Sequence, residues 1–216
     1  MKKNKTTLFI IFFVLIFIGL VVFFYLKKDM PLLRNQQSDE AERLSAEIQA
    51  NEEASEKEYK QEHPDETEIA SYSTILKDKA SGRINNIKIT CDTLNGYIVK
   101  VGDEFSFESI VGPATSAKGY QKAKVIENGK TVQALGGGNC QVSSTLYNAI
   151  LEVPDLEVTE RHPHGKKVTY VPEGKDAAVS HGSYDLKFVN NTPDDIKMYL
   201  STDEENVYVT LVKLTY

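Results

Sequence analysis

Cys140 is the residue whose type and position most strongly suggest chemistry. It follows three glycines and Asn139, and a helical pattern begins at this point of the sequence. A helix N-terminus presents unpaired N–H groups and a partial charge of about +0.5, both of which would stabilise a thiolate. The glycines would also let a substrate carbonyl approach backbone N–H groups, which could then act as an oxyanion hole. The sequence therefore predicts a nucleophilic thiol at position 140.

Histidines that follow Cys140 could supply the base that a thiolate nucleophile needs. The histidines of the expected folded region are His162, His164 and His181. A cysteine at a helix start, followed by strands that carry a histidine and then an acidic or amide residue, is the order of papain-like and transglutaminase-like enzymes. By this analogy the catalytic residues are Cys140, His164 and Asp176, with Asp185 as an alternative partner for the imidazole. His164 is preferred to His162 because it follows a proline, where the chain can turn toward the helix start.

Three other roles for these side chains remain open. Cysteine is among the most buried residue types, so Cys140 could simply pack against the glycine turn. Cys91 is the second cysteine of the chain and could form a disulfide with it in an oxidising compartment. The three histidines and Cys140 are also ligand types that zinc accepts, but their spacing is not diagnostic and a proline interrupts the histidine pair. We therefore expect no metal and no cofactor.

The residues beside the thiol and beside the histidine pair are predicted to bind the ligand. Gly137, Gly138 and Gln141 flank the thiol, and Arg161 and His162 belong to a basic segment further along the chain. Aromatic residues are spread among these segments, and core packing accounts for most of them. A cleft with basic and aromatic walls could hold an anionic or glycan-bearing fragment of the cell wall.

An α+β domain is expected to position these residues. Apolar residues at helical spacing predict helices over 83–94 and 140–153, and Asn128-Gly129 is typical of a tight hairpin turn. Alternating patterns bounded by turn residues predict an extended stretch at 102–107 and strands at 156–161, 185–190, 196–201 and 207–214. The short turns favour antiparallel pairing, so we expect the central helix to pack on a C-terminal antiparallel sheet.

The N-terminal region predicts a membrane anchor. Residues 8–26 are nineteen residues without a charge, which is long enough to cross the hydrocarbon core of a bilayer. A cleaved signal peptide is less favoured because the apolar run is long and no small-residue cleavage site follows it. Residues 1–7 would form a cytoplasmic tail, although the lysines on both sides of the span determine the orientation only weakly.

The segment that follows the span is acidic. Between 35 and 68 the chain has twelve Asp or Glu residues against three Lys or Arg, with few apolar residues. Such a segment cannot build a core, so residues 27–68 are predicted to be a flexible or helical stalk and residues 69–216 the folded domain. The net charge of −6 and the lack of a basic cluster in the folded part exclude nucleic acid as a partner.

The segment 136–149, GGGNCQVSSTLYNA, resembles the signature block of the VanW-like family. Further segments similar to the family are found at 102–107, 111–113, 161–164, 170–177 and 185–188. The resemblance extends from about Tyr72 to Lys213, which is nearly the whole folded region. Glu108, Asn139 and Gly165 depart from the family pattern, but the cysteine and the histidines match it.

This resemblance implies an exported protein of the cell envelope in a Gram-positive-type setting, with its C-terminal domain outside the membrane and with physiology linked to peptidoglycan. The family takes its name from an accessory protein of vancomycin-resistance gene clusters, which suggests a link to glycopeptide resistance but implies no reaction. The expected partners are the membrane and either cell-wall material or another envelope protein. Two hypotheses follow: a non-catalytic envelope module, or a thiol-dependent acyltransferase or amidase acting on peptidoglycan peptides through Cys140.

Overall fold

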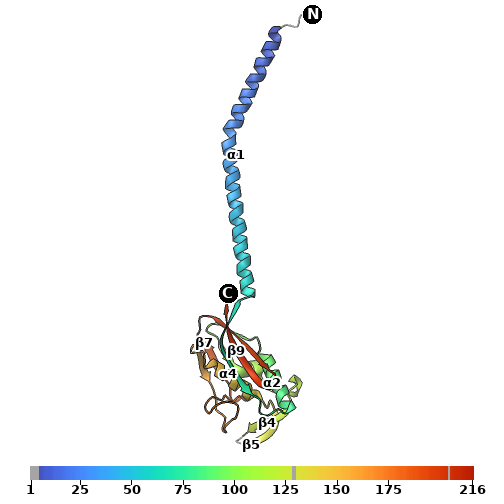
Figure 1. Cartoon of the computed structure of the whole chain (residues 1–216), viewed down its shortest axis with the longest axis vertical. Helices are drawn as coiled ribbons and strands as arrows, with labels where there is room; N and C mark the ends of the chain where they lie inside the picture. The colour runs from blue at the N-terminus through green and yellow to red at the C-terminus, as the bar shows by residue number, and fades with distance from the viewer. Residues whose placement is uncertain (1–4, 128–129, 204) are drawn as a thin grey trace. The chain divides into compact units, whose positions relative to one another are not determined.

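The computed structural model describes residues 5–127, 130–203 and 205–216, except for the side chains of 5–13, 29–37, 126–127 and 130. The chain divides into two compact units, Met1–Glu62 and His63–Tyr216. The first unit contains a single long helix, α1 (Lys5–Glu62), drawn in blue to cyan in Figure 1. Each unit is described by itself.

Helix α1 includes most of the acidic segment that the sequence assigned to a stalk. The side chains of residues 38–62 are all exposed, and Lys60 and Glu56 form an i, i+4 ion pair at 3.9 Å. An exposed pair of this kind adds only a few tenths of a kcal/mol, about 0.3–0.5, to helix stability. Among the described side chains, no helix is long and apolar enough to cross a membrane. The start of the span predicted over 8–26, residues 8–13, lies outside the described side chains, and the span stays a prediction.

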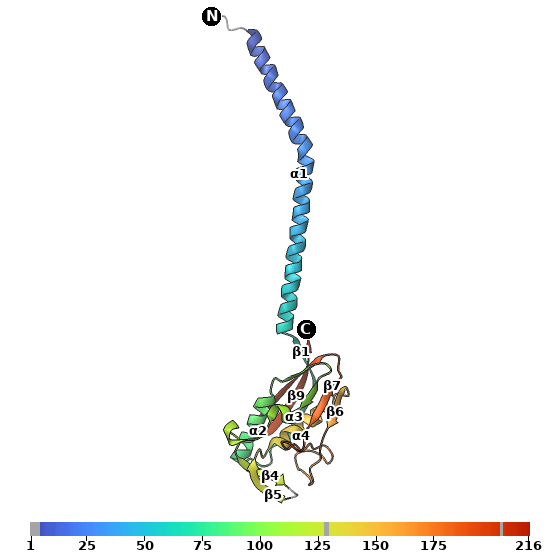
Figure 2. The same cartoon turned by 180° about the vertical axis from the view of Figure 1, so that it is seen from behind.

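The second unit is built from antiparallel strands in three groups (Figures 1 and 2). The largest sheet has the order β1-β9-β8-β2, with β1 at Asp65–Ile75, β9 at Asn206–Thr215, β8 at Asp195–Thr202 and β2 at Ile98–Val99. A second sheet has the order β3-β7-β6, with β3 at Glu104–Ser106, β7 at Lys187–Asn190 and β6 at Leu156–Glu160. The third group is the hairpin of β4 (Lys122–Glu127) and β5 (Lys130–Leu135).

Two helices cover the four-stranded sheet. Helix α4 (Asn139–Ile150) packs against β1 and β9, and α2 (Ser81–Leu94) packs against β8 and α4. The core between them is apolar, because Ile87, Leu146 and Met198 are all fully buried. The core residues all belong to the second unit, so this unit has a hydrophobic core of its own. A short helix, α3 (Phe107–Val111), and a 3-10 turn at Ser116–Lys118 connect β3 to the hairpin.

The predicted mixed α/β fold with antiparallel sheets is confirmed. Both predicted helices are present, although α4 ends at Ile150 rather than at residue 153, and the predicted hairpin pairs Ala123 with Ala134. The Asn128-Gly129 turn predicted for that hairpin lies outside the described residues.

The sheet differs from the predicted C-terminal sheet in its composition. The long strand β1 was not predicted, and it begins at Asp65, inside the segment assigned to the stalk. It pairs only with β9, so one edge is unpaired and its first four side chains are exposed. Charged residues such as Glu66 and Glu68 are compatible with an exposed edge strand but hide the alternating pattern on which the prediction relied. The C-terminal strands are also divided, since β6 and β7 join β3 in a separate sheet.

Candidate functional site

A cleft of about 500 Å³ lies at the N-terminal end of α4. Its walls come from α2, α3, the β4–β5 hairpin, the glycine turn at 136–138 and the loops that follow β6. The polar side chains that line it include Arg83, Glu108, Cys140, His164, Tyr170 and His181. The predicted thiol and two of the three predicted histidines therefore line one cleft.

Cys140 lies in the first turn of α4, after the N-cap residue Gly138. Its Sγ donates a hydrogen bond to the carbonyl oxygen of Val179 at 3.4 Å. Burial raises the pKa of the Cys140 thiol, and the nearby Arg83 opposes this effect only in part. The shift is opposite to the one predicted from the helix N-terminus, because desolvation of the thiolate outweighs the hydrogen bond with Val179 and the charge of Arg83.

The disulfide that the sequence left open is absent. Cys91 and Cys140 are both free, and Cys91 is buried in the core with 1% of its surface exposed. Burial also raises the pKa of Cys91 to about 12. Cys91 is therefore a small apolar core residue, and the thiol at the cleft is that of Cys140.

The glycines before Cys140 are required by close packing. A Cβ atom at Gly137 would lie 2.8 Å from the backbone oxygen of Lys124, and one at Gly138 would lie 2.7 Å from Ile87 Cγ1. Gly138 also has a φ of 124°, which side chains rarely allow. Both glycines are buried, so the predicted role of giving a ligand access to the backbone is joined by a packing role that the sequence did not reveal.

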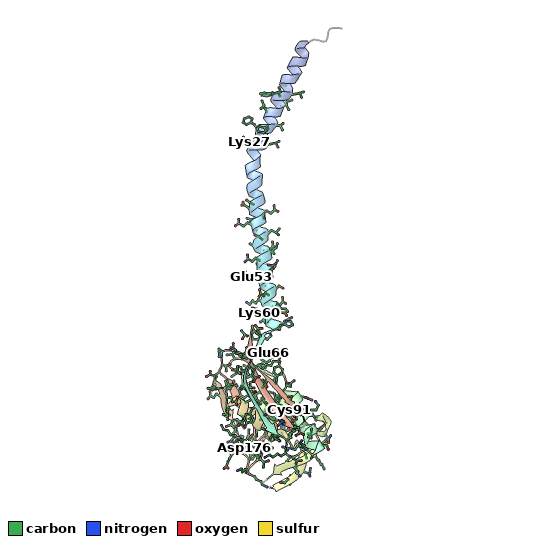
Figure 3. The ribbon with its side chains drawn as sticks, viewed as in Figure 1. Lys27, Glu53, Lys60, Glu66, Cys91 and Asp176 are labelled. Carbon is green, nitrogen blue, oxygen red and sulfur yellow. The ribbon has the colours of Figure 1, made fainter. Side chains whose placement is uncertain are left out.

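His164 and Asp176 form the strongest polar contact of the site, and Figure 3 marks the position of Asp176. Asp176 Oδ2 lies 2.7 Å from His164 Nδ1 and accepts a hydrogen bond from the His164 backbone N–H at 2.6 Å. Burial alone would raise the pKa of Asp176, but these hydrogen bonds outweigh it and the pKa is lowered. An ionised carboxylate can only accept a hydrogen bond, so Nδ1 of His164 is the donor in this contact.

Two further side chains hold this pair in place. Arg161 Nη2 donates to Asp176 Oδ1 at 2.8 Å, and Arg161 Nε donates to the Asp176 carbonyl at 2.6 Å. The ring of Tyr170 meets the imidazole of His164 edge-on, at 6.5 Å between centroids. Arg161 therefore holds Asp176 in place, and its predicted role in binding a ligand stays a prediction.

The histidines are engaged with three different carboxylates. His162 pairs with Glu160 at 2.9 Å and lies outside the cleft, whereas His181 pairs with Glu108 at 3.1 Å on the cleft wall. In the part of the chain that the structure describes, no hydrogen bond joins Cys140 to an imidazole, and no group of three His, Cys, Asp or Glu side chains could hold a metal ion. Asp185, the alternative partner for the imidazole, instead accepts hydrogen bonds from Ser106 and from the backbone at Glu108.

Gln141 lines the cleft, but its side-chain amide is engaged by the protein itself, and its predicted role in binding a ligand stays a prediction. Its side chain is buried, and its Nε2 donates to Thr74 Oγ1 and to the Ile75 carbonyl, both at 3.1 Å. Its Oε1 accepts from Arg83 Nη2 at 2.8 Å. Gln141 thus holds Arg83 at the cleft wall. No site role was predicted for Arg83, because only the packing of α2 against α4 brings Arg83 and Gln141 together.

Comparison with known proteins identifies the family of the chain. The family model described as VanW like protein matches residues 82–212, which include every cleft residue named above. The chain belongs to the VanW-like protein family. The predicted resemblance is therefore confirmed over most of the second unit.

Two curated relatives each match more than half of the chain. The uncharacterized protein YoaR of Bacillus subtilis (strain 168) is 37% identical over 128 residues, covering 59% of this chain and 42% of YoaR. The vancomycin B-type resistance protein VanW of Enterococcus faecalis (strain ATCC 700802 / V583) is 33% identical over 130 residues, covering 58% of this chain and 47% of that protein. The chain thus spans less than half the length of either relative. No solved structure matches it.

Proposed function

We propose that this chain is a membrane-anchored protein of the cell envelope, and that the cleft at Cys140 binds peptides of the cell wall. The observation that carries the binding proposal is the cleft itself, which combines a volume of about 500 Å³ with convergent polar groups of both signs. Its size suits a short peptide segment. The name of the Enterococcus relative, a vancomycin B-type resistance protein, supports a connection with the envelope and with glycopeptide resistance.

The anchor rests on the sequence of residues 8–26, which contains no charge over nineteen residues. We expect the full chain to sediment with the membranes of a Gram-positive host, and deletion of 8–26 to release it, as followed by immunoblot of cell fractions. An equally long deletion in the acidic part of α1, residues 38–56, should leave the chain in the membrane fraction. Membrane association that survives the loss of 8–26 would refute the anchor.

A thiol-dependent acyltransferase or amidase acting on the same peptides is the second candidate. It is favoured by the contact of His164 Nδ1 with Asp176, which leaves Nε2 as the second ring nitrogen of a side chain that lines the cleft. Burial raises the pKa of the Cys140 thiol, and among the described residues no hydrogen bond joins it to an imidazole, which disfavours an activated nucleophile. On this candidate, Cys140→Ala would abolish turnover of a wall peptide while binding persists. On the binding proposal there is no turnover to lose.

The binding proposal is tested by whether a wall peptide shields Cys140 from alkylation. Cys140 lines the cleft, so an occupant must restrict the access of a reagent to its thiol. A peptide that binds without any effect on the thiol would place the binding site elsewhere.

A further inference from the structure

We propose that Arg83 forms a carboxylate-binding subsite in the cleft, so that the ligand is a peptide with a free carboxylate. This inference rests on the proposed function, because it requires that the cleft holds a ligand. It names the chemical group by which that ligand is recognised.

The guanidinium of Arg83 is a charge without a counter-charge. Arg83 lines the cleft, yet among the described side chains no carboxylate forms an ion pair with it. Its Nη2 donates to the neutral amide of Gln141, and its Nε is shielded from solvent without any hydrogen-bond partner. A shielded donor without a partner is unfavourable, so the protein itself leaves part of the hydrogen-bonding capacity of this guanidinium unused.

Gln141 fixes the position of the guanidinium without neutralising its charge. The amide is itself immobile, since it is buried and donates to Thr74 and to the Ile75 carbonyl. A carboxylate at this position would have formed an internal ion pair with Arg83. The amide instead leaves the full positive charge available to a ligand.

The other charged groups of the cleft are paired with residues of the protein itself. Lys124 lies 3.8 Å from Asp78, and His181 contacts Glu108 at 3.1 Å. Glu108 is the acidic side chain on the cleft wall, and its carboxylate is the partner of His181. His164 is held by Asp176 at 2.7 Å. Among the cations that line the described cleft, Arg83 is therefore the one whose charge is most available to an anionic ligand.

The geometry favours a carboxylate over a phosphate. A single guanidinium is planar and matches the two oxygens of a carboxylate, whereas sites for the doubly charged phosphate usually combine several cations or a backbone nest. The carboxylate could be the C-terminus of a peptide or an acidic side chain within it. Both sources present the same group to Arg83, and the experiment below distinguishes them.

The test uses the purified full chain and a fluorescent pentapeptide of the wall type, with an internal D-glutamate and a C-terminal D-alanine. Three forms are compared by fluorescence anisotropy: the free acid, its C-terminal amide, and the free acid with glutamine in place of the glutamate. We expect one of the two modified forms to bind at least about tenfold more weakly than the free acid, as for loss of a charge-assisted hydrogen bond. The form that loses affinity identifies the source of the carboxylate.

The variants assign this discrimination to Arg83. Arg83→Gln should weaken the free acid to the level of the weaker modified form, and Arg83→Lys should restore part of the difference, because it keeps the charge but loses the planar fork. Lys88→Gln is the matched control, since Lys88 is a cation of the same helix α2 that is not part of the cleft lining and pairs with Asp92 at 3.0 Å. It should leave discrimination unchanged. Circular dichroism confirms that each variant is folded.

Each outcome has a distinct meaning. If the three forms bind the unmutated chain equally well, the carboxylate subsite is refuted while the binding proposal stands, and this comparison needs no variant. If discrimination survives Arg83→Gln, another residue binds the carboxylate and the inference is wrong. If none of the three forms binds, the proposed function fails, and the subsite fails with it.

Discussion

Replacing Asp176 with alanine should lower the free energy of unfolding by about 3–5 kcal/mol, the range for removing one partner of a buried charge network. Asp176 is buried and accepts hydrogen bonds from Arg161 and from His164, so its loss removes the counter-charge of a guanidinium and the acceptor of an imidazole and of a backbone N–H. Urea unfolding followed by circular dichroism measures the change. The control is Asp92→Ala, which removes an exposed ion pair with Lys88 and should cost less than about 1 kcal/mol.

The effect of Asp176 should also depend on pH. Its pKa is lowered in the folded chain, so its charge stabilises the fold above the unfolded pKa of about 3.9. That contribution is lost as the pH falls through the folded pKa. The difference in stability between the unmutated chain and Asp176→Asn should therefore be full near neutral pH and shrink below about pH 4. A stability difference that is the same at pH 7 and at pH 3 would mean that the charge of Asp176 does not stabilise the fold.

Gly138→Ala is expected to have the second largest effect, lowering the free energy of unfolding by about 2–5 kcal/mol. The added methyl group would lie 2.7 Å from Ile87 Cγ1 and 3.2 Å from the Arg83 carbonyl, and the φ of 124° adds backbone strain. Gly165→Ala is the matched control, because a Cβ atom there meets nothing within 4 Å. Thermal unfolding of both variants measures the difference.

The glycine variants also separate two explanations of the turn. If Gly138→Ala unfolds at the same temperature as the unmutated chain but no longer binds a wall peptide, the glycine serves ligand access, as the sequence predicted. If stability falls as expected, packing against α2 is sufficient to explain it. The close approach of Gly138 to Ile87 favours the second result.

Much of the fold was predictable because local patterns agree with the tertiary structure. The stripe of Val142, Leu146 and Ile150 predicts α4, and these three residues are all fully buried in the core. Strand β1 was not predictable in the same way, because its charged first half faces solvent and its pairing with β9 joins segments far apart in the chain. Helix α3 has five residues, too few for a helical pattern to be recognised.

The sequence predicted several of the residues that meet at the site, but not the interactions that each of them makes there. The order of Cys140, His164 and Asp176 suggested one site, and the structure brings His164 and Asp176 into contact and His164 and Cys140 to one cleft. Their catalytic roles stay predictions. The sequence could not show that burial raises the pKa of the Cys140 thiol, because burial depends on long-range packing that includes the loop with Val179. Nor could it show that Arg161 is engaged while Arg83 lacks a counter-charge, since both facts depend on long-range contacts.

The central claim, that a wall peptide occupies the cleft at Cys140, is tested most directly by the rate at which iodoacetamide alkylates this thiol in the full chain. Cys91 is buried and its pKa is raised to about 12, so mass spectrometry of the native chain should detect labelling at Cys140 alone. The reaction is run at about pH 9. The pKa of the Cys140 thiol lies above its usual value of about 8.5, so little thiolate is present at neutral pH. Free glutathione in the same solution controls for consumption of the reagent.

We predict that the free-acid pentapeptide slows alkylation of Cys140 in a saturable way, with half of the effect at the dissociation constant measured by anisotropy, while alkylation of glutathione is unchanged. Peptide binding that leaves the alkylation rate of Cys140 unchanged at saturation would contradict the claim and place the ligand outside the cleft.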